Sequence, residues 1–103
     1  MSELADITID AVLARISEIA PELRANGVTR LALFGSRARG DARPDSDLDV
    51  LIETSQMQPP PFDYFKVLRL IEQATGLQVQ ISQRKLLKPR IAERIADDLI
   101  EVF

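Results

Sequence analysis

The stretch GSRARGDARPDSDLD, residues 35–49, joins a glycine–serine corner to two closely spaced aspartates. Gly35 lacks a side chain, so the backbone there can adopt conformations closed to other residues and can lie directly against a ligand. If a short helix opens at Ser36, its free N–H groups and the serine hydroxyl face an anion such as a phosphate. Arg37 and Arg39 can add charge-assisted hydrogen bonds to phosphate oxygens. The loop therefore predicts an anion site, although glycine-rich loops of this kind are common.

The two aspartates, Asp47 and Asp49, make the prediction more specific. They stand two residues apart on a predicted strand, 47–53, so both carboxylates project from the same face of the sheet. The apolar residues of this segment point the other way: Leu48, Val50 and Ile52. Adjacent carboxylates repel each other, and a bound divalent cation relieves that repulsion. We expect Asp47 and Asp49 to bind Mg²⁺, or alternatively Mn²⁺, which in turn bridges the phosphates held by the loop.

Helical and strand patterns alternate on both sides of this stretch. We expect a helix over about residues 8–26, strands over 28–34, 47–53 and 77–82, a helix over 62–75, and a helical stripe from 84 that Pro89 interrupts or restarts. Three consecutive prolines end the segment 56–61 and predict a stiff extended connector. This order predicts an α+β fold, a small mixed β-sheet with helices packed on one face. At 103 residues the chain forms a single domain, residues 1–103.

The composition limits the ligands and partners that the chain can bind. Hydrophobic residues make up 46% and charged residues 28% of the chain, which is typical of a globular domain. The net charge of −3 argues against binding of extended nucleic acid, which requires a basic surface. The sequence has neither Cys nor His, so any metal must be held by oxygen ligands. No apolar run approaches the roughly 20 residues that span a bilayer, and the acidic start does not resemble a signal peptide, so we expect a cytoplasmic protein without a membrane partner.

Several other charged and apolar residues have two interpretations. Asp41 and Asp45 are expected to be solvated turn carboxylates. The basic residues near the C-terminus form either a solvated helix face or a contact to a triphosphate or an acidic partner: Arg84, Lys85, Lys88, Arg90 and Arg94. The last apolar residues either pack onto the domain or meet another subunit in a homo-oligomer: Leu99, Ile100, Val102 and Phe103.

The motif as a whole resembles the signature of minimal nucleotidyltransferases of the DNA polymerase β-like superfamily. The matching residues are Gly35-Ser36, Arg37, Arg39-Gly40 and Ser46-Asp47-Leu48-Asp49, and the similarity extends over nearly the whole chain. The resemblance implies a nucleotidyltransferase fold, nucleotide binding by Gly35, Ser36, Arg37 and Arg39, and metal ligation and catalysis by Asp47 and Asp49. It also implies ATP or another nucleoside triphosphate as the substrate.

Because the chain is small, the resemblance also implies a partner protein. Such small proteins resemble the antitoxin half of toxin–antitoxin pairs whose partner is a HEPN-domain ribonuclease, and some of them transfer AMP onto that partner. We therefore expect transfer of a nucleoside monophosphate, most plausibly AMP from ATP, to a hydroxyl of a partner protein.

One residue departs from the family pattern. The family has a third carboxylate on the neighbouring strand, where this chain has Gln80. A neutral amide cannot accept the proton of an attacking hydroxyl, although its carbonyl oxygen can still contact a cation. Glu53 shares the face of Asp49 but lies roughly 13 Å along the strand, too far to replace the missing carboxylate. The alternative function is therefore a catalytically degenerate binding module that neutralises a HEPN-type toxin by complex formation.

Overall fold

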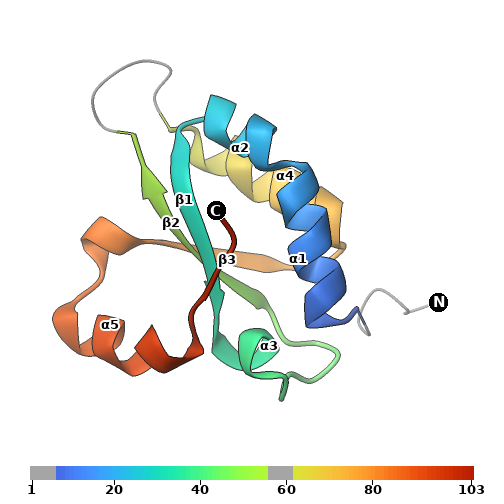
Figure 1. Ribbon diagram of the computed structural model, residues 1–103, viewed down its shortest axis with the longest axis vertical. Helices are drawn as coiled ribbons and strands as arrows, with labels where there is room; N and C mark the ends of the chain where they lie inside the picture. Colours follow the sequence, from blue (N-terminus) through green and yellow to red (C-terminus); the bar gives the residue numbers. More distant parts are fainter. Residues whose placement is uncertain (1–6, 56–61) are drawn as a thin grey trace.

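A mixed sheet forms the centre of the computed structural model, which describes residues 7–55 and 62–103 (Figure 1). The predicted connector at 56–61 lies outside the described residues. The strands within the described ranges are β1 (Val28–Phe34), β2 (Leu48–Thr54), β3 (Val79–Gln83) and β4 (Ile100–Glu101), in the spatial order β3-β2-β1-β4. β1 pairs antiparallel with both β2 and β4, whereas β2 pairs parallel with β3. The mixed sheet of the predicted α+β fold is thus confirmed.

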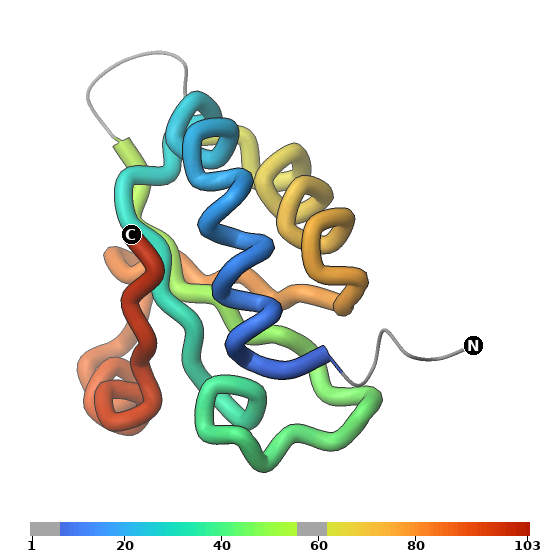
Figure 2. The backbone as a smooth tube through the Cα atoms, turned by 45° about the vertical axis from the view of Figure 1, so that its right-hand side comes forward, coloured from blue at the N-terminus to red at the C-terminus, as the bar shows by residue number. Residues whose placement is uncertain are grey.

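Three helices cover one face of this sheet: α1 (Ile9–Glu18), α2 (Ala20–Ala25) and α4 (Tyr64–Thr75). Figure 2 shows them together on one side of the strands. Alternation along the strands turns one set of apolar side chains toward these helices: Leu31, Leu33, Leu48, Val50 and Ile52, all 0–1% exposed. The helices contribute the other half of the core: Val12, Ile16, Leu23, Val67 and Ile71. Burial of this apolar surface is the main force that holds the helical layer on the sheet.

The C-terminal segment adds a smaller layer on the opposite face of the sheet. The 3₁₀ turn η2 (Arg84–Leu86), helix α5 (Pro89–Ile95) and the 3₁₀ turn η3 (Ala96–Asp98) lie there, away from the three other helices (Figure 1). Ile95 packs against Ala32 and Leu51, which alternate with the residues of the main core. The sequence pattern predicts helices on one face of the sheet. This holds for α1, α2 and α4, whereas α5 covers part of the other face.

Pro21 divides the first predicted helix into two. A single helix was expected over about residues 8–26, whereas α1 ends at Glu18 and α2 begins at Ala20. Proline lacks an N–H group and its ring disfavours helical geometry in the preceding turn, so it is tolerated in the first turn of α2 but not within a longer helix. The start of α1 matches the prediction, because Thr8 Oγ1 accepts a hydrogen bond from the Ala11 N–H at 3.1 Å.

The last apolar residues pack onto the domain, in agreement with the first of the two interpretations given for them above. β4 pairs with β1, and Val102 and Phe103 contact the main core. The Leu31 N–H donates to the Phe103 carbonyl at 3.2 Å, and the Val102 N–H donates to the Leu31 carbonyl at 2.8 Å. Arg24 lies over the Phe103 ring, 4.8 Å from its centroid. Among the described residues, every helix is too short or too polar to traverse a lipid bilayer.

Candidate functional site

Gly35 and Asp49 meet where β1 ends and β2 begins. Phe34, the last residue of β1, pairs with Asp49, and Gly35 follows with φ of +80°. A Cβ added at Gly35 would overlap Asp49 Oδ2 and lie 3.2 Å from its Cγ. Only glycine both adopts this backbone conformation and leaves room for the carboxylate. The structure therefore places the glycine–serine corner directly against one of the two aspartates.

Asp47 lies close enough to Asp49 to influence its protonation. Burial raises the pKa of Asp49, the negative charge of Asp47 raises it further, and the Arg39 guanidinium acts in the opposite direction. β2 begins at Leu48, one residue later than predicted, so Asp47 stands just before the strand. A partly buried carboxylate whose pKa is raised by burial and by a neighbouring carboxylate is a suitable ligand for a hard cation, whose charge would relieve the repulsion.

Gln80 lies beside Asp49 on the neighbouring strand. The parallel register of β2 and β3 pairs these two residues directly. Gln80 is exposed and lines an open hollow of about 490 Å³ together with Asp47 and Glu72. Within residues 7–55 and 62–103, acidic side chains nowhere gather in a group of three that could hold a metal ion. The side chains near this corner that could offer oxygen atoms to a cation are therefore those of Asp47, Asp49 and Gln80.

Helix α3 (Gly35–Arg39) carries Ser36 at the start of a single helical turn. Gly40 ends this turn with φ of +88°, and its N–H donates to the Ser36 carbonyl at 2.9 Å. The Asp41 N–H donates to the same carbonyl at 3.0 Å. Within residues 7–55 and 62–103, no side chain caps the beginning of α3, so its first N–H groups are not used by a side chain of this part of the chain and could face a ligand at the corner.

Arg37 donates to its own loop in the structure, and its contact to a phosphate stays a prediction. Its residue is only 7% exposed, and its guanidinium points under the loop that precedes β2. Nε donates to the Ser46 carbonyl at 3.0 Å, and Nη2 donates to the carbonyls of Pro44 at 3.2 Å and Arg43 at 3.4 Å. The sequence did not reveal this, because nothing in the motif distinguishes an arginine that binds its own loop from one that binds a ligand. Arg37 fixes the loop that delivers Asp47.

Arg39 is exposed and held by two carboxylates. Nε donates to Asp41 Oδ2 at 3.2 Å, and Nη1 donates to Asp98 Oδ2 at 2.9 Å. These hydrogen bonds, with the attraction of both charges, raise the pKa of Arg39 above its ordinary value. Asp41, expected to be merely solvated, is thus an ion-pair partner. Sequence reasoning missed Asp98 because 59 residues separate it from Arg39 and no local pattern marks it.

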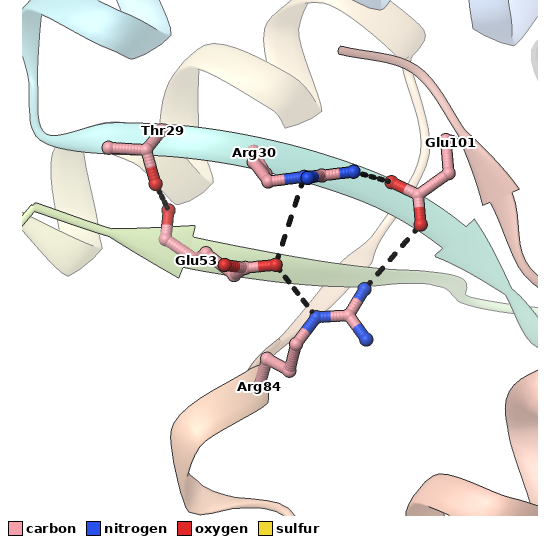
Figure 3. A network of polar contacts seen from close by, with 5 residues as sticks. All are labelled: Thr29, Arg30, Glu53, Arg84 and Glu101. Atoms are coloured by element: carbon pink, nitrogen blue, oxygen red, sulfur yellow. Dashed lines mark hydrogen bonds and ion pairs between the residues drawn. The ribbon is translucent and has the colours of Figure 1, made fainter.

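A second charged cluster lies outside this site (Figure 3). Arg84 contacts Glu53 at 2.9 Å and Glu101 at 3.6 Å, and Arg30 contacts the same two carboxylates at 3.8 and 3.6 Å. These pairs link β1, β2, β4 and η2 across the surface of the sheet. Glu53 is therefore engaged far along β2, in agreement with the expectation that it does not replace the missing carboxylate. Arg84, one of the basic residues predicted to be solvated or ligand-binding, is paired within the domain.

Comparison with known proteins gives a consistent result. The nucleotidyltransferase domain family matches residues 13–102. Protein adenylyltransferase MntA of Thermococcus cleftensis is 28% identical over 100 residues, which cover 96% of this chain and all of that protein. A solved structure described, provisionally, as a minimal nucleotidyltransferase is 30% identical with a TM-score of 0.76 and covers 91% of this chain and 95% of its own.

A more distant solved structure shares the fold alone. It is the complex of a tri-AMPylated HEPN toxin of Shewanella oneidensis with MNT antitoxin, at 13% identity and a TM-score of 0.60, covering 89% of this chain and 71% of the other. The family match spans most of the chain and includes the glycine–serine corner and both aspartates. With the register of β1, β2 and β3 described above, it shows that the chain belongs to the nucleotidyltransferase domain family.

Proposed function

We propose that this protein transfers a nucleoside monophosphate, AMP from ATP, to a hydroxyl group of a partner protein. The contact between Gly35 and Asp49 carries the proposal, because the glycine–serine corner lies directly against a carboxylate whose pKa is raised by burial and by Asp47. The comparisons support the acceptor class, since a full-length relative is named a protein adenylyltransferase and a protein of the same fold is bound to an AMPylated HEPN toxin. A HEPN-domain toxin is the proposed partner.

The residues of the corner would bind and orient the triphosphate. The free N–H groups at the start of α3 and the Ser36 hydroxyl donate to phosphate oxygens, and Arg39 adds a charged donor. Asp47 and Asp49 would hold Mg²⁺, with Mn²⁺ as a substitute, and the bound cation would neutralise the charge that develops on the phosphates. Gln80, which pairs with Asp49 on the neighbouring strand, would offer its side-chain carbonyl as a further oxygen ligand.

The hollow next to Asp47 and Gln80 is the place where the acceptor can enter. The acceptor hydroxyl oxygen forms a bond to the α-phosphorus, the bond from that phosphorus to the bridging oxygen of the β-phosphate breaks, and pyrophosphate leaves. The proton of the hydroxyl passes to water, because the amide of Gln80 cannot accept it. The domain supplies the nucleotide and the electrostatic environment, and the partner supplies the nucleophile.

The experiment combines the purified chain, ATP, Mg²⁺ and a HEPN-domain protein as the acceptor, followed by intact-mass measurement of both proteins. Transfer predicts a partner heavier by one or more AMP groups and release of pyrophosphate. The Asp49→Asn variant and a reaction with excess chelator serve as controls and should leave the partner unmodified. Parallel reactions with GTP, CTP and UTP give the base preference.

A second function is favoured by a specific observation, the amide at position 80. With Gln80 beside Asp49, the chain could instead keep the fold and neutralise the toxin by covering its surface. In that case the two proteins form a stable complex, the partner mass stays unchanged with every nucleotide, and toxin inhibition persists in the Asp49→Asn variant. Loss of inhibition in that variant would argue for transfer.

A further inference from the structure

The guanidinium of Arg39 lies between two carboxylates that come from different parts of the chain. Asp41 follows α3 directly, whereas Asp98 belongs to η3 near the C-terminus. Both accept hydrogen bonds from Arg39, at 3.2 and 2.9 Å. A guanidinium offers five N–H donors in a planar fork. The N–H groups that are not used in these two hydrogen bonds can donate to a further anion.

Arg39 also lies close to the nucleotidyltransferase site. It ends the helical turn that begins at Gly35, and Gly35 lies directly against Asp49. Helix α3 packs against both β1 and β2 and also contacts η3. An interaction between Arg39 and Asp98 therefore connects the C-terminal segment to the corner where the proposed triphosphate binds.

The two carboxylates differ in how firmly the fold holds them. The Asp98 side chain is 19% exposed and its bond is the shorter, whereas the Asp41 side chain is 61% exposed. η3 is anchored on both sides, by Ile95 packed on the sheet and by β4 paired with β1. The backbone of Asp41 is held by the hydrogen bond from its N–H to the Ser36 carbonyl, but its exposed side chain is free to rotate into solvent. Breaking the bond from Arg39 to Asp41 should therefore cost less than breaking the bond to Asp98.

We propose that Asp98 is a positioning residue that aims Arg39 at the phosphates of the nucleotide, and that Asp41 occupies the place of a phosphate oxygen until the nucleotide binds. This inference rests on the proposed nucleotide-transfer function. When the triphosphate arrives, Arg39 keeps its bond to Asp98 and exchanges Asp41 for a phosphate oxygen. The two carboxylates then have opposite effects on affinity: Asp98 favours the nucleotide and Asp41 competes with it.

The test is the affinity of the full chain for ATP, ADP and AMP in Mg²⁺, measured by isothermal titration calorimetry. Asp98→Ala should weaken ATP and ADP binding by about tenfold and AMP binding by less than about twofold, because a directed charge-assisted bond to the outer phosphates is lost. Asp41→Ala should bind ATP at least as tightly as the wild type. Asp97→Ala is the matched control, because Asp97 is an exposed residue of the same 3₁₀ turn. In an Arg39→Ala background, adding Asp98→Ala should have no further effect.

Asp98→Asn keeps an oxygen acceptor but removes the charge, so it provides a second variant if Asp98→Ala does not fold. It too should weaken ATP binding more than Asp97→Ala does. Equal ATP affinity of the Asp98 variants and Asp97→Ala would overturn the inference, as would an Asp41→Ala variant that loses ATP as strongly as Asp98→Ala. If these results came with a wild type that binds ATP and modifies its partner, only this inference would fail. A wild type that binds no ATP would overturn the proposed function as well.

Discussion

Gly35 leaves the space that the Asp49 carboxylate occupies, since a side chain at position 35 would overlap Asp49 Oδ2 and approach its Cγ to 3.2 Å. The contact joins the end of β1 to the start of β2 and so couples the phosphate corner to the proposed metal ligand. Four predictions follow from this contact and from its neighbours.

Gly35→Ala should abolish transfer while costing only moderate stability. A positive φ strains an L-residue by roughly 1–2 kcal/mol, and the new methyl group also displaces the Asp49 carboxylate. A displacement of this kind should reduce the transfer rate by about a hundredfold or more. Gly40→Ala is the matched control, because Gly40 has φ of +88° but open space around it. Thermal unfolding should show similar losses of stability for both variants. Transfer assays should show the large loss of rate only for Gly35→Ala, and equal transfer rates of the two variants would contradict the steric argument.

Asp49→Asn should raise the free energy of unfolding of the metal-free protein at neutral pH, although the variant should not catalyse transfer. Because the pKa of Asp49 is raised in the folded state, that state binds the proton more tightly than the unfolded chain does. The free energy of unfolding of the wild type therefore falls as pH rises through the raised pKa, and the neutral amide escapes this loss. The melting temperature of the variant in chelator, measured from acidic to neutral pH, should begin to exceed that of the wild type as pH rises past the ordinary pKa of an aspartate, and the difference should be complete above the raised pKa of Asp49. Asp45→Asn, at an exposed turn position, should track the wild type; a gain of the same size there would refute the local explanation.

Gln80→Asp should increase both metal affinity and transfer rate. The register places position 80 directly beside Asp49, so the new carboxylate becomes a third oxygen ligand and a proton acceptor. If the wild type is an impaired enzyme, the rate in Mg²⁺ should rise on the order of a hundredfold, while the melting temperature in chelator should fall because like charges then lie side by side. Gln78→Asp, at an exposed position just before β3 and outside this pairing with Asp49, should give a much smaller rate gain. No difference between the two variants would mean that position 80 is not part of the metal site.

Arg37→Ala should destabilise the fold more than it weakens nucleotide binding. The substitution leaves the carbonyls of Arg43, Pro44 and Ser46 without their donor in a part-buried setting. Urea unfolding should show a loss of roughly 1–3 kcal/mol. Arg43→Ala removes an exposed arginine from the same loop and should cost much less. If Arg37→Ala kept wild-type stability but lost ATP affinity, Arg37 would be a phosphate ligand after all.

Much of this arrangement follows from local sequence patterns. Strand β1 lies at the predicted residues 28–34, and the period-two alternation of β2 correctly assigns Leu48, Val50 and Ile52 to the core. Such patterns report which face of an element is buried, and they report it well where one face is apolar and the other polar.

The remaining features depend on contacts between distant parts of the chain. β4 has only two residues and forms because β1 offers an open edge, which no periodicity can reveal. The burial of Arg37 depends on how the loop before β2 folds back over α3, and the pairing of Arg39 with Asp98 depends on the path of the C-terminal segment. Electrostatic partners chosen by tertiary structure leave no trace in local spacing.

The alternation of apolar and acidic residues along β2 also links the position of Asp49 to the packing of the core. If β2 slipped by one residue against β1, Asp49 would enter the helical layer and Leu48 or Val50 would move to the opposite face, so the misaligned sheet would lose its core. The same packing that selects the register of β2 therefore also sets Asp49 against Gly35. Gln80, by contrast, is exposed and contributes nothing to that core, so a substitution there can change the proposed site without disturbing the fold.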